Sequence, residues 1–170
     1  MRTLNIDIET FSSVDIGKSG AYKYAMSDDF QILLFAYSID GQDVKIVDLA
    51  QGEAIPEEVL ALLKDEKCTK YAYNAVFEWW CLNMAGIETP LEQWQCTMVH
   101  GLYCGYTAGL AAIGNAMGLP QDKKKLTTGS ALIRYFCIPC KPTKSNGTRP
   151  RNLPQHAPEK WHLFKDYCIQ

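Results

Sequence analysis

The sequence of 170 residues has no long hydrophobic run and no excess of charge of one sign. No apolar stretch reaches the ~18–20 residues that a membrane-spanning helix needs, and the first residues lack the pattern of a secretory signal peptide. The 17 Lys and Arg residues nearly balance the 19 Asp and Glu residues, so the overall field does not attract nucleic acid. We therefore expect a cytoplasmic protein without membrane contact, in which any nucleic-acid contact comes from a local patch.

Internal repeats, heptads and a second hydrophobic unit are also absent. With 47% hydrophobic and 21% charged residues, the composition is that of an ordinary globular domain and excludes a disordered or fibrous protein. The seven cysteines are an odd number, and several lie inside apolar runs, where a reduced cysteine behaves as a small hydrophobic residue. We expect a single domain over residues 1–170, monomeric, with reduced and mostly buried thiols.

The pattern of apolar residues predicts an α/β fold with a mixed sheet. Strands are predicted at residues 3–9, 32–39, 44–49 and 69–73, and residues 94–99 fit either a fifth strand or the start of a helix. An Asp-Gly pair at residues 40–41 predicts an antiparallel hairpin between the second and third strands. Helices are predicted to begin at Pro56 and Asn74 and to cover residues 110–117, 128–136 and 158–170. Five prolines predict a long irregular loop at residues 136–158.

Three carboxylates are candidates for a metal site. Asp7 and Glu9 lie two residues apart on the first predicted strand, so their side chains leave the same face of the sheet. Oxygen ligands of this kind suit magnesium and manganese. Glu78 falls one turn into a helix that follows a strand, at the end of the sheet where α/β folds keep their sites. The alternatives are an edge strand that exposes Asp7 and Glu9 to solvent and a solvated helix position for Glu78.

Residues 7–10 (Asp-Ile-Glu-Thr) and 74–78 (Asn-Ala-Val-Phe-Glu) resemble the first two motifs of the DEDD, or DnaQ-like, superfamily of 3′–5′ exonucleases. Residues 96–99, 118–125, 132–137 and 158–168 are similar to stretches in the proofreading domains of phage and prophage DNA polymerases of family A type. The resemblance covers nearly the whole chain. It implies a ribonuclease H-like three-layer fold, with a mixed five-stranded sheet flanked by helices. It also implies that the protein acts in the cytoplasm of a bacterial host.

The sequence departs from the superfamily pattern at two places. Glu78 stands where the superfamily more often has aspartate. The third motif is a tyrosine followed by an aspartate four positions later; Tyr167 matches the tyrosine, but the chain stops at Gln170. We therefore expect a fragment that ends inside this motif, with impaired cleavage and the polymerase domain beyond the C-terminus. His162 and Asp166 are one residue too close for the histidine subgroup, so Asp166 is expected to be a solvated helix residue.

The resemblance implies hydrolysis of single-stranded DNA at its 3′ end, releasing nucleoside 5′-monophosphates. Two Mg2+ or Mn2+ ions would be held by Asp7, Glu9, Glu78 and the missing aspartate. Tyr167 would orient the attacking water, unless it is only packed on the last helix. Thr10, Phe11, Asn74 and Phe77 are the expected substrate-binding residues, and Asn74 would also support the site by a hydrogen bond.

Basic and aromatic residues provide candidate DNA contacts. The basic set comprises Lys123, Lys124, Lys125, Arg134, Lys141, Lys144, Arg149 and Arg151. The aromatic set comprises Phe11, Phe77, Trp79 and Trp80. The alternative for the basic set is a solvated flank, and the alternative for the aromatic set is a packed core.

The cysteines and histidines do not predict a zinc site. Cys137 and Cys140 with His156 and His162 do not have the spacing of a zinc finger, so no zinc is expected there. His100 is expected to be structural.

Two other functions remain open from the sequence. A 3′ exonuclease of the same superfamily that acts on RNA would carry the same motifs. A nucleic-acid binding module that has lost its catalytic site would keep the fold, and the absent aspartate is the feature in its favour.

Overall fold

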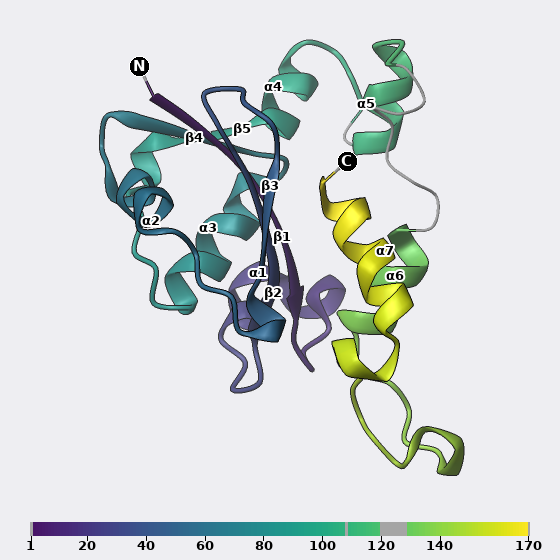
Figure 1. Ribbon diagram of the computed structural model, residues 1–170. Helices are drawn as coiled ribbons and strands as arrows, with labels where there is room; N and C mark the ends of the chain where they lie inside the picture. Colours follow the sequence, from purple (N-terminus) through teal and green to yellow (C-terminus); the bar gives the residue numbers. More distant parts are fainter. Residues whose placement is uncertain (1, 108, 120–128, 170) are drawn as a thin grey trace.

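The computed structural model describes residues 2–107, 109–119 and 129–169, and its centre is a five-stranded mixed sheet (Figure 1). The strand order is β3-β2-β1-β4-β5. The first three strands pair antiparallel, whereas β1, β4 and β5 run parallel. The strands are β1 (Arg2–Phe11), β2 (Gln31–Ile39), β3 (Lys45–Asp48), β4 (Cys68–Ala72) and β5 (Trp94–Cys96). The predicted mixed sheet is therefore confirmed.

Helices cover both faces of the sheet, which gives three layers. In Figure 1, α2 and α3 lie on one face, α6 and α7 lie on the other, and α4 and α5 lie near the C-terminal end of α7. The helices are α1 (Ile16–Ala25), α2 (Glu57–Lys64), α3 (Ala75–Met84), α4 (Thr97–Tyr103), α5 (Leu110–Ala116), α6 (Gly129–Phe136) and α7 (Pro158–Ile169). Short 3-10 turns are formed by η1 (Leu49–Gln51), η2 (Leu91–Gln93), η4 (Lys144–Asn146) and η5 (Pro154–His156). The ribonuclease H-like α/β fold expected from the sequence is confirmed. No described helix is long and apolar enough to cross a bilayer.

Each face of the sheet has its own hydrophobic core. Leu4, Ile6 and Ile8 of β1 belong to the core that α2 and α3 cover. The opposite core contains Phe164 and other residues of α6 and α7. Because side chains alternate along a strand, Asp7 leaves β1 on the face that α7 covers.

The predicted hairpin between β2 and β3 is confirmed. Asp40 and Gly41 both have positive φ values, of 51° and 73°, as a two-residue turn of this kind requires. The long β1–β2 pairing continues to Phe11, with a register shift between Glu9 and Thr10. Such a bulge changes the direction of the side chains around it, and here it lies next to a candidate site residue.

The structure also contains a helix that the sequence did not predict. Helix α1 has weak apolar periodicity and is interrupted at Gly20, whose φ of 78° and ψ of 167° are not helical. For residues 94–99, the sequence allowed either a fifth strand or the start of a helix. The structure contains both, because β5 ends at Cys96 and α4 begins at Thr97. The predicted helices at residues 128–136 and 158–170 are found at 129–136 and 158–169; residues 128 and 170 lie outside the described residues.

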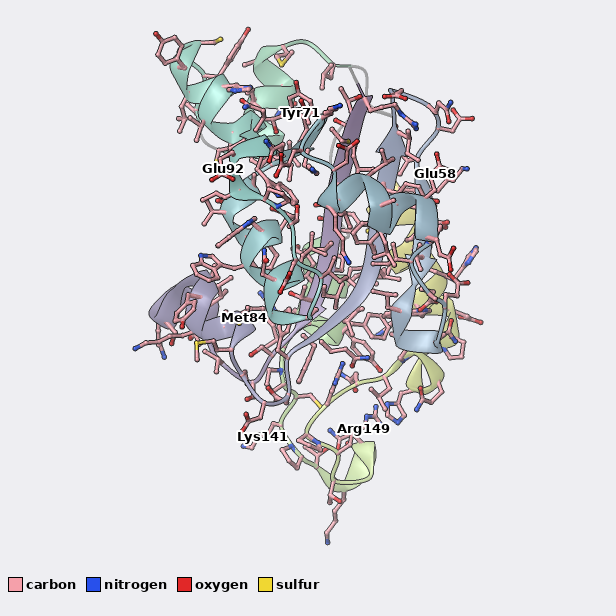
Figure 2. The ribbon with its side chains drawn as sticks, turned by 90° about the vertical axis from the view of Figure 1, so that its left-hand side faces the viewer. Glu58, Tyr71, Met84, Glu92, Lys141 and Arg149 are labelled. Carbon is pink, nitrogen blue, oxygen red and sulfur yellow. The ribbon has the colours of Figure 1, made fainter. Side chains whose placement is uncertain are left out.

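The proline-rich segment between α6 and α7 is irregular, as predicted, but it is held by hydrogen bonds. The Cys140 amide donates to the Pro150 carbonyl at 2.8 Å, which closes the loop at its base. The Asn152 side chain donates to the Tyr135 carbonyl at 3.0 Å and accepts from Arg149 Nε at 2.9 Å. The labelled Lys141 and Arg149 in Figure 2 show this loop at the lower end of the molecule.

Candidate active site

The candidate site lies where two parallel strands separate. β1 and β4 pair only as far as Asn5 and Tyr71. β4 then ends, whereas β1 continues, and α3 begins just beyond the end of β4. Asp7 is two residues past the last pair, beside this opening. Loss of pairing at this point lets α3 bring a side chain close to the edge of the central strand.

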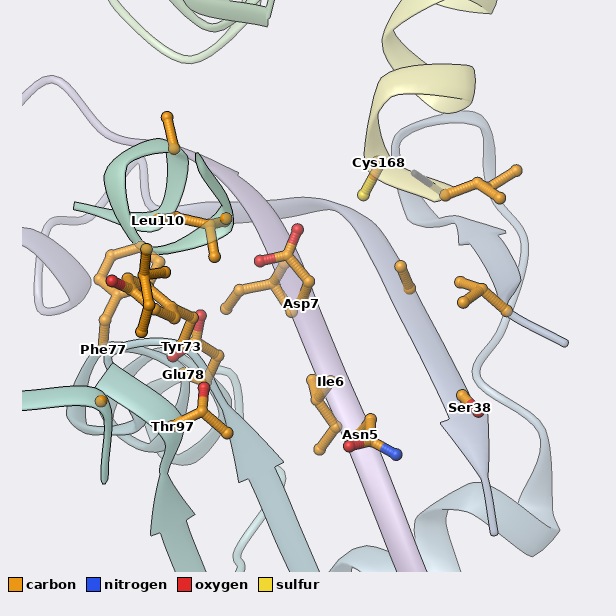
Figure 3. Close-up of a pocket in the computed structure, with 18 of the residues that line it drawn as sticks. Asn5, Ile6, Asp7, Ser38, Tyr73, Phe77, Glu78, Thr97, Leu110 and Cys168 are labelled. Carbon is orange, nitrogen blue, oxygen red and sulfur yellow. The ribbon is translucent and has the colours of Figure 1, made fainter. Parts of the chain in front are cut away.

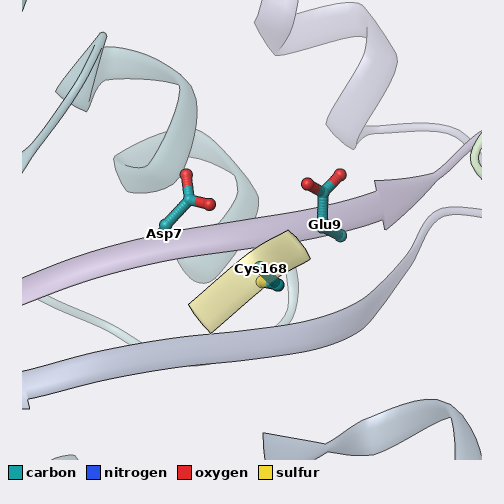
Figure 4. A group of neighbouring side chains, drawn as sticks. All are labelled: Asp7, Glu9 and Cys168. Atoms are coloured by element: carbon teal, nitrogen blue, oxygen red, sulfur yellow. The ribbon is translucent and has the colours of Figure 1, made fainter. Parts of the chain in front are cut away.

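Asp7 and Glu9 form a compact group with a thiol from the last helix (Figure 4). One oxygen of each carboxylate and the Cys168 sulfur all lie within 4.8 Å of one another. Asp7 is exposed, whereas Glu9 is only 9% exposed. β1 is the central strand, so the alternative of an exposed edge strand is excluded. The shared face predicted for the two carboxylates is what the structure shows.

Glu78 is buried and not a solvated helix residue. Its side chain is 3% exposed, and Oε2 has no hydrogen-bond partner among the described residues. Burial, together with the negative charges of Asp7 and Glu9, raises the pKa of Glu78 to about 9. A buried carboxyl group of this kind must be protonated or neutralised by a cation.

A cavity of about 800 Å³ joins the three carboxylates (Figure 3). Asp7, Glu9 and Glu78 contribute polar lining, and much of the remaining lining is apolar. The apolar lining includes Phe77, Tyr106, Leu110, Ile113, Met117 and Leu119. Cavities that bind small ligands have volumes in this range and combine apolar walls with few polar groups. The arrangement can hold a charged group at one end and a planar apolar group at the other.

Tyr167 lines the same cavity from α7. Its ring is 7% exposed and stacks on Phe164, with centroids 6.2 Å apart and planes 7° apart. It also packs so closely against Gly129 of α6 that a Cβ there would overlap the ring. The ring is thus fixed by its neighbours, and the proposed role in orienting water stays a prediction.

Asn74 and Phe77 flank Glu78 at the start of α3. Asn74 is the residue before the helix and has a left-handed backbone conformation, with φ of 72°, but its side chain makes no capping hydrogen bond. Phe77 lines the cavity, and its ring centroid is 6.0 Å from that of Tyr24. The backbone at Asn74 therefore sets the direction in which α3 leaves β4.

Thr10 and Phe11 are buried among protein partners. The Thr10 hydroxyl is 2.9 Å from the Tyr24 hydroxyl. Phe11 is 3% exposed, and the Arg151 guanidinium lies 3.8 Å above its ring. Arg151 also donates to Gln31 Oε1 at 2.8 Å, and burial lowers its pKa. The expected substrate contacts of Thr10 and Phe11 stay predictions.

The described part of the predicted basic flank lies on α6 and the loop that follows. Lys141 and Lys144 are exposed on that loop, whereas Arg149 donates to the Asn146 carbonyl at 2.9 Å. Arg134 is exposed on α6. Lys123, Lys124 and Lys125 lie outside the described residues. Binding of DNA by this flank stays a prediction.

The tryptophans of α3 have protein partners as well. Trp79 Nε1 donates to the Thr89 carbonyl at 3.0 Å. Trp80 packs edge-on against Tyr22, with ring centroids 4.6 Å apart. His100 is exposed, and its Nε2 is 3.1 Å from Gln95 Oε1. These contacts favour a structural role for the three side chains.

No sequence pattern indicated that two thiols lie beside Glu9. Cys137 Sγ lies 3.8 Å from Glu9 Oε2, and Cys168 is on the same carboxylate group. Cys140 instead donates its thiol to the Arg149 carbonyl at 3.3 Å, so Cys137 and Cys140 have separate partners. Only the fold brings residues so distant in sequence together. The apolar neighbours of both cysteines in the sequence indicated simple core packing.

Comparisons with known proteins show which sequences and folds the chain resembles. The chain is 53% identical over 171 residues to the DNA polymerase of Bacillus phage SP02 and spans about a quarter (26%) of its length. No protein-family model matches the chain. NrnC of Brucella melitensis with bound Mg2+ superposes with a TM-score of 0.53 and 20% identity, over 74% of this chain and 56% of that one. Trypanosoma brucei RNase D, in complex with RNA U12, has a TM-score of 0.53 and 18% identity, over 98% and 55%. The chain is thus homologous to part of a phage DNA polymerase and shares the fold of DEDD-type exonucleases.

Proposed function

We propose that this chain is a 3′–5′ exonuclease domain of a phage-type DNA polymerase, which hydrolyses single-stranded DNA from its 3′ end and releases nucleoside 5′-monophosphates. The observation that carries the proposal is the buried Glu78 carboxyl group, which shares one cavity with Asp7 and Glu9. The similarity to a phage DNA polymerase supports DNA as the substrate and proofreading as the role.

The carboxylate cluster fits a hard divalent cation. Three carboxyl groups line one cavity, and the Glu78 oxygen without a partner leaves an acceptor for a ligand. Asp7, Glu9 and Glu78 would hold Mg2+ or Mn2+ through oxygen, which is the donor that these ions prefer. When bound, such ions supply a hydroxide nucleophile near neutral pH and neutralise charge on the phosphate. The protein then needs no strong base of its own.

The other side chains of the cavity would bind and orient the DNA end. Phe77, Leu110 and Met117 offer apolar surface to the terminal base, and such surface accepts any base because every base has a π face. Indifference to base identity is what proofreading requires. Tyr167 would orient the attacking water from α7. Asn74 would act as a positioning residue, because its backbone directs the start of α3 and hence Glu78.

A fourth carboxylate would complete the site. The superfamily motif places an aspartate four positions after Tyr167, which is three positions after Cys168. On a helix, residues three apart lie on the same face, and Cys168 already faces Asp7 and Glu9. We therefore expect the chain extended by Asp-Val at its C-terminus to cleave faster than the 170-residue chain. Equal rates would show that the fourth carboxylate is not needed.

The proposal is tested by manganese-dependent shortening of a 5′-labelled single-stranded DNA. In the extended protein, Asp7→Asn should abolish removal of nucleotides from the 3′ end. Asp28→Asn, at an exposed position, is the matched control and should keep the wild-type rate. Equal trimming by the two variants would refute the proposed site.

An RNA exonuclease is the second candidate function. The superposition on Trypanosoma brucei RNase D, whose structure contains RNA, extends over 98% of this chain. Deoxyribo- and ribo-oligomers of the same sequence distinguish the two, because a contact to the 2′-hydroxyl is what tells RNA from DNA. Faster trimming of the ribo-oligomer would favour this candidate. Strand binding that depends on neither Mg2+ nor Asp7, without cleavage, would instead indicate a non-catalytic binding module.

A further inference from the structure

Two buried thiols lie beside the Glu9 carboxylate group. Cys168 of α7 belongs to the compact group with Asp7 and Glu9, and Cys137 lies 3.8 Å from Glu9 Oε2. Both cysteines are almost fully buried, with 6% and 7% exposure. Phosphodiester hydrolysis through oxygen-bound ions makes no use of sulfur. These thiols are therefore a chemical feature of the site that the proposed function leaves unexplained.

Sulfur changes which cations the site prefers. Magnesium binds oxygen, whereas thiolates select softer ions such as zinc. Zinc lies ~2.3 Å from sulfur and ~2.1 Å from carboxylate oxygen, so sulfur and oxygen on one tetrahedral zinc ion are ~3.6 Å apart. The oxygen and sulfur atoms of Asp7, Glu9 and Cys168 already lie within 4.8 Å of one another. Contraction of this group by about 1 Å would bring all three atoms to the separations of one tetrahedral site.

A second observation points to a cation at this place. Glu78 lines the same cavity, is 3% exposed, and has an oxygen without a hydrogen-bond partner among the described residues. Figures 3 and 4 show the two halves of this arrangement: Glu78 with Asp7 across the cavity, and Cys168 beside Asp7 and Glu9. Three protein groups are thus close enough to share one ion, and zinc sites with three protein ligands take water or a substrate in the fourth position.

We propose that the carboxylate centre has a second binding mode, in which Zn2+ or another thiophilic divalent cation is held by Asp7, Glu9 and the Cys168 thiolate. The Cys168 thiol gives its proton to solvent as the metal–sulfur bond forms. Because the two modes share Asp7 and Glu9, zinc and magnesium compete for the centre. Only this competition rests on the proposed function; the thiolate site itself does not.

Cadmium provides the direct test, because a cadmium–thiolate bond absorbs in the ultraviolet. Titration of the intact chain with Cd2+ should give this absorption at the first equivalent. Cys168→Ser should remove it and weaken Cd2+ binding at least tenfold. Cys140→Ser, at a loop position away from the cavity lining, is the matched control and should keep both. Unchanged absorption and affinity in Cys168→Ser, or their loss in Cys140→Ser, would overturn the proposal.

Two further variants make the test independent of folding and of Cys104, another thiol of the cavity lining. Cys168→Ala adds no polar atom to the buried site, so it replaces the serine variant if circular dichroism shows that serine disturbs the fold. Cys104 also lines the cavity, and loss of the absorption in Cys104→Ser with retention in Cys168→Ser would overturn the assignment.

Binding of Mn2+, followed by its paramagnetic resonance signal, distinguishes this proposal from the proposed function. Asp7→Asn should weaken the binding of Mn2+ and Cd2+ alike, whereas Cys168→Ser should weaken Cd2+ at least tenfold more than Mn2+. A Cd2+–thiolate signal in a protein that never trims DNA would refute the exonuclease and leave this site standing. Manganese-dependent trimming without the signal would do the reverse.

Discussion

Replacement of Glu78 by glutamine should remove a strong dependence of stability on pH. Burial raises the pKa of Glu78 to about 9, from 4.5 for a free side chain. Between these two values the folded protein keeps a proton that the unfolded chain has lost. The folded state then binds more protons, so the free energy of unfolding falls as pH rises through this window and is constant above it.

The magnitude follows from the window. Each pH unit is worth ~1.4 kcal/mol, so the metal-free protein should lose ~4 kcal/mol through Glu78 between pH 5 and pH 8. The side chain is almost fully buried, so solvent screening does not reduce this figure. Glutamine cannot ionise, and its buried amide costs ~1–3 kcal/mol that is the same at every pH. The difference in slope, and not the absolute stability, is therefore the quantity to measure.

Urea unfolding followed by tryptophan fluorescence, in EDTA at pH 5, 6.5 and 8, provides this slope. Glu57→Gln, at an exposed position in the first turn of α2, is the matched control and should keep the wild-type slope. A difference in slope below ~1 kcal/mol across the interval would refute an uncompensated burial of Glu78. Saturating Mg2+ should flatten the wild-type curve, because a bound cation stabilises the ionised carboxylate.

Substitutions at three further positions are tested by the same unfolding measurement. Gly129→Ala should cost ~1–3 kcal/mol, because its methyl group overlaps the Tyr167 ring and one of two packed helices must move; an unchanged midpoint contradicts this contact. Trp161→Phe should cost ~1.5–3 kcal/mol by removing the 2.7 Å bond from the indole nitrogen to the buried Asp48 carboxylate, and a loss below ~0.5 kcal/mol would count against it. Asn74→Ala should cost ~1–2 kcal/mol more than Asn74→Gly, because glycine adopts the left-handed conformation freely; equal stabilities would rule out backbone strain as the reason.

Local signals were sufficient for most of the sheet and for the carboxylates. Alternation along β1 predicted that Asp7 and Glu9 share a face, and the Asp40–Gly41 pair predicted the hairpin, because both depend on neighbours in sequence. Helix α1 was missed for a related reason. Gly20 interrupts it, and its stability comes from packing on α3 more than from its own sequence.

The sequence identified the candidate site residues, but it did not predict how buried they are or which side chains surround them. The position of Glu78 after a strand indicated a site, but its burial depends on how β1 and β4 separate, which no local pattern encodes. The two thiols beside Glu9 come from segments more than a hundred residues away. A cysteine in an apolar run has the same sequence signature whether its neighbours are methyl groups or carboxylates.

The centre joins the first strand to the last helix, and this has a consequence for the order in which the protein acquires its site. A chain made from its N-terminus can form the β1–β2–β3 meander early, because those pairings are short-range. The face of β1 that carries Asp7 and Glu9 stays uncovered until α7 has left the ribosome and packed against it. A growing chain would therefore carry exposed carboxylates without the ring of Tyr167 or the thiol of Cys168 beside them. We expect the candidate site to be among the last parts of this domain to mature during synthesis.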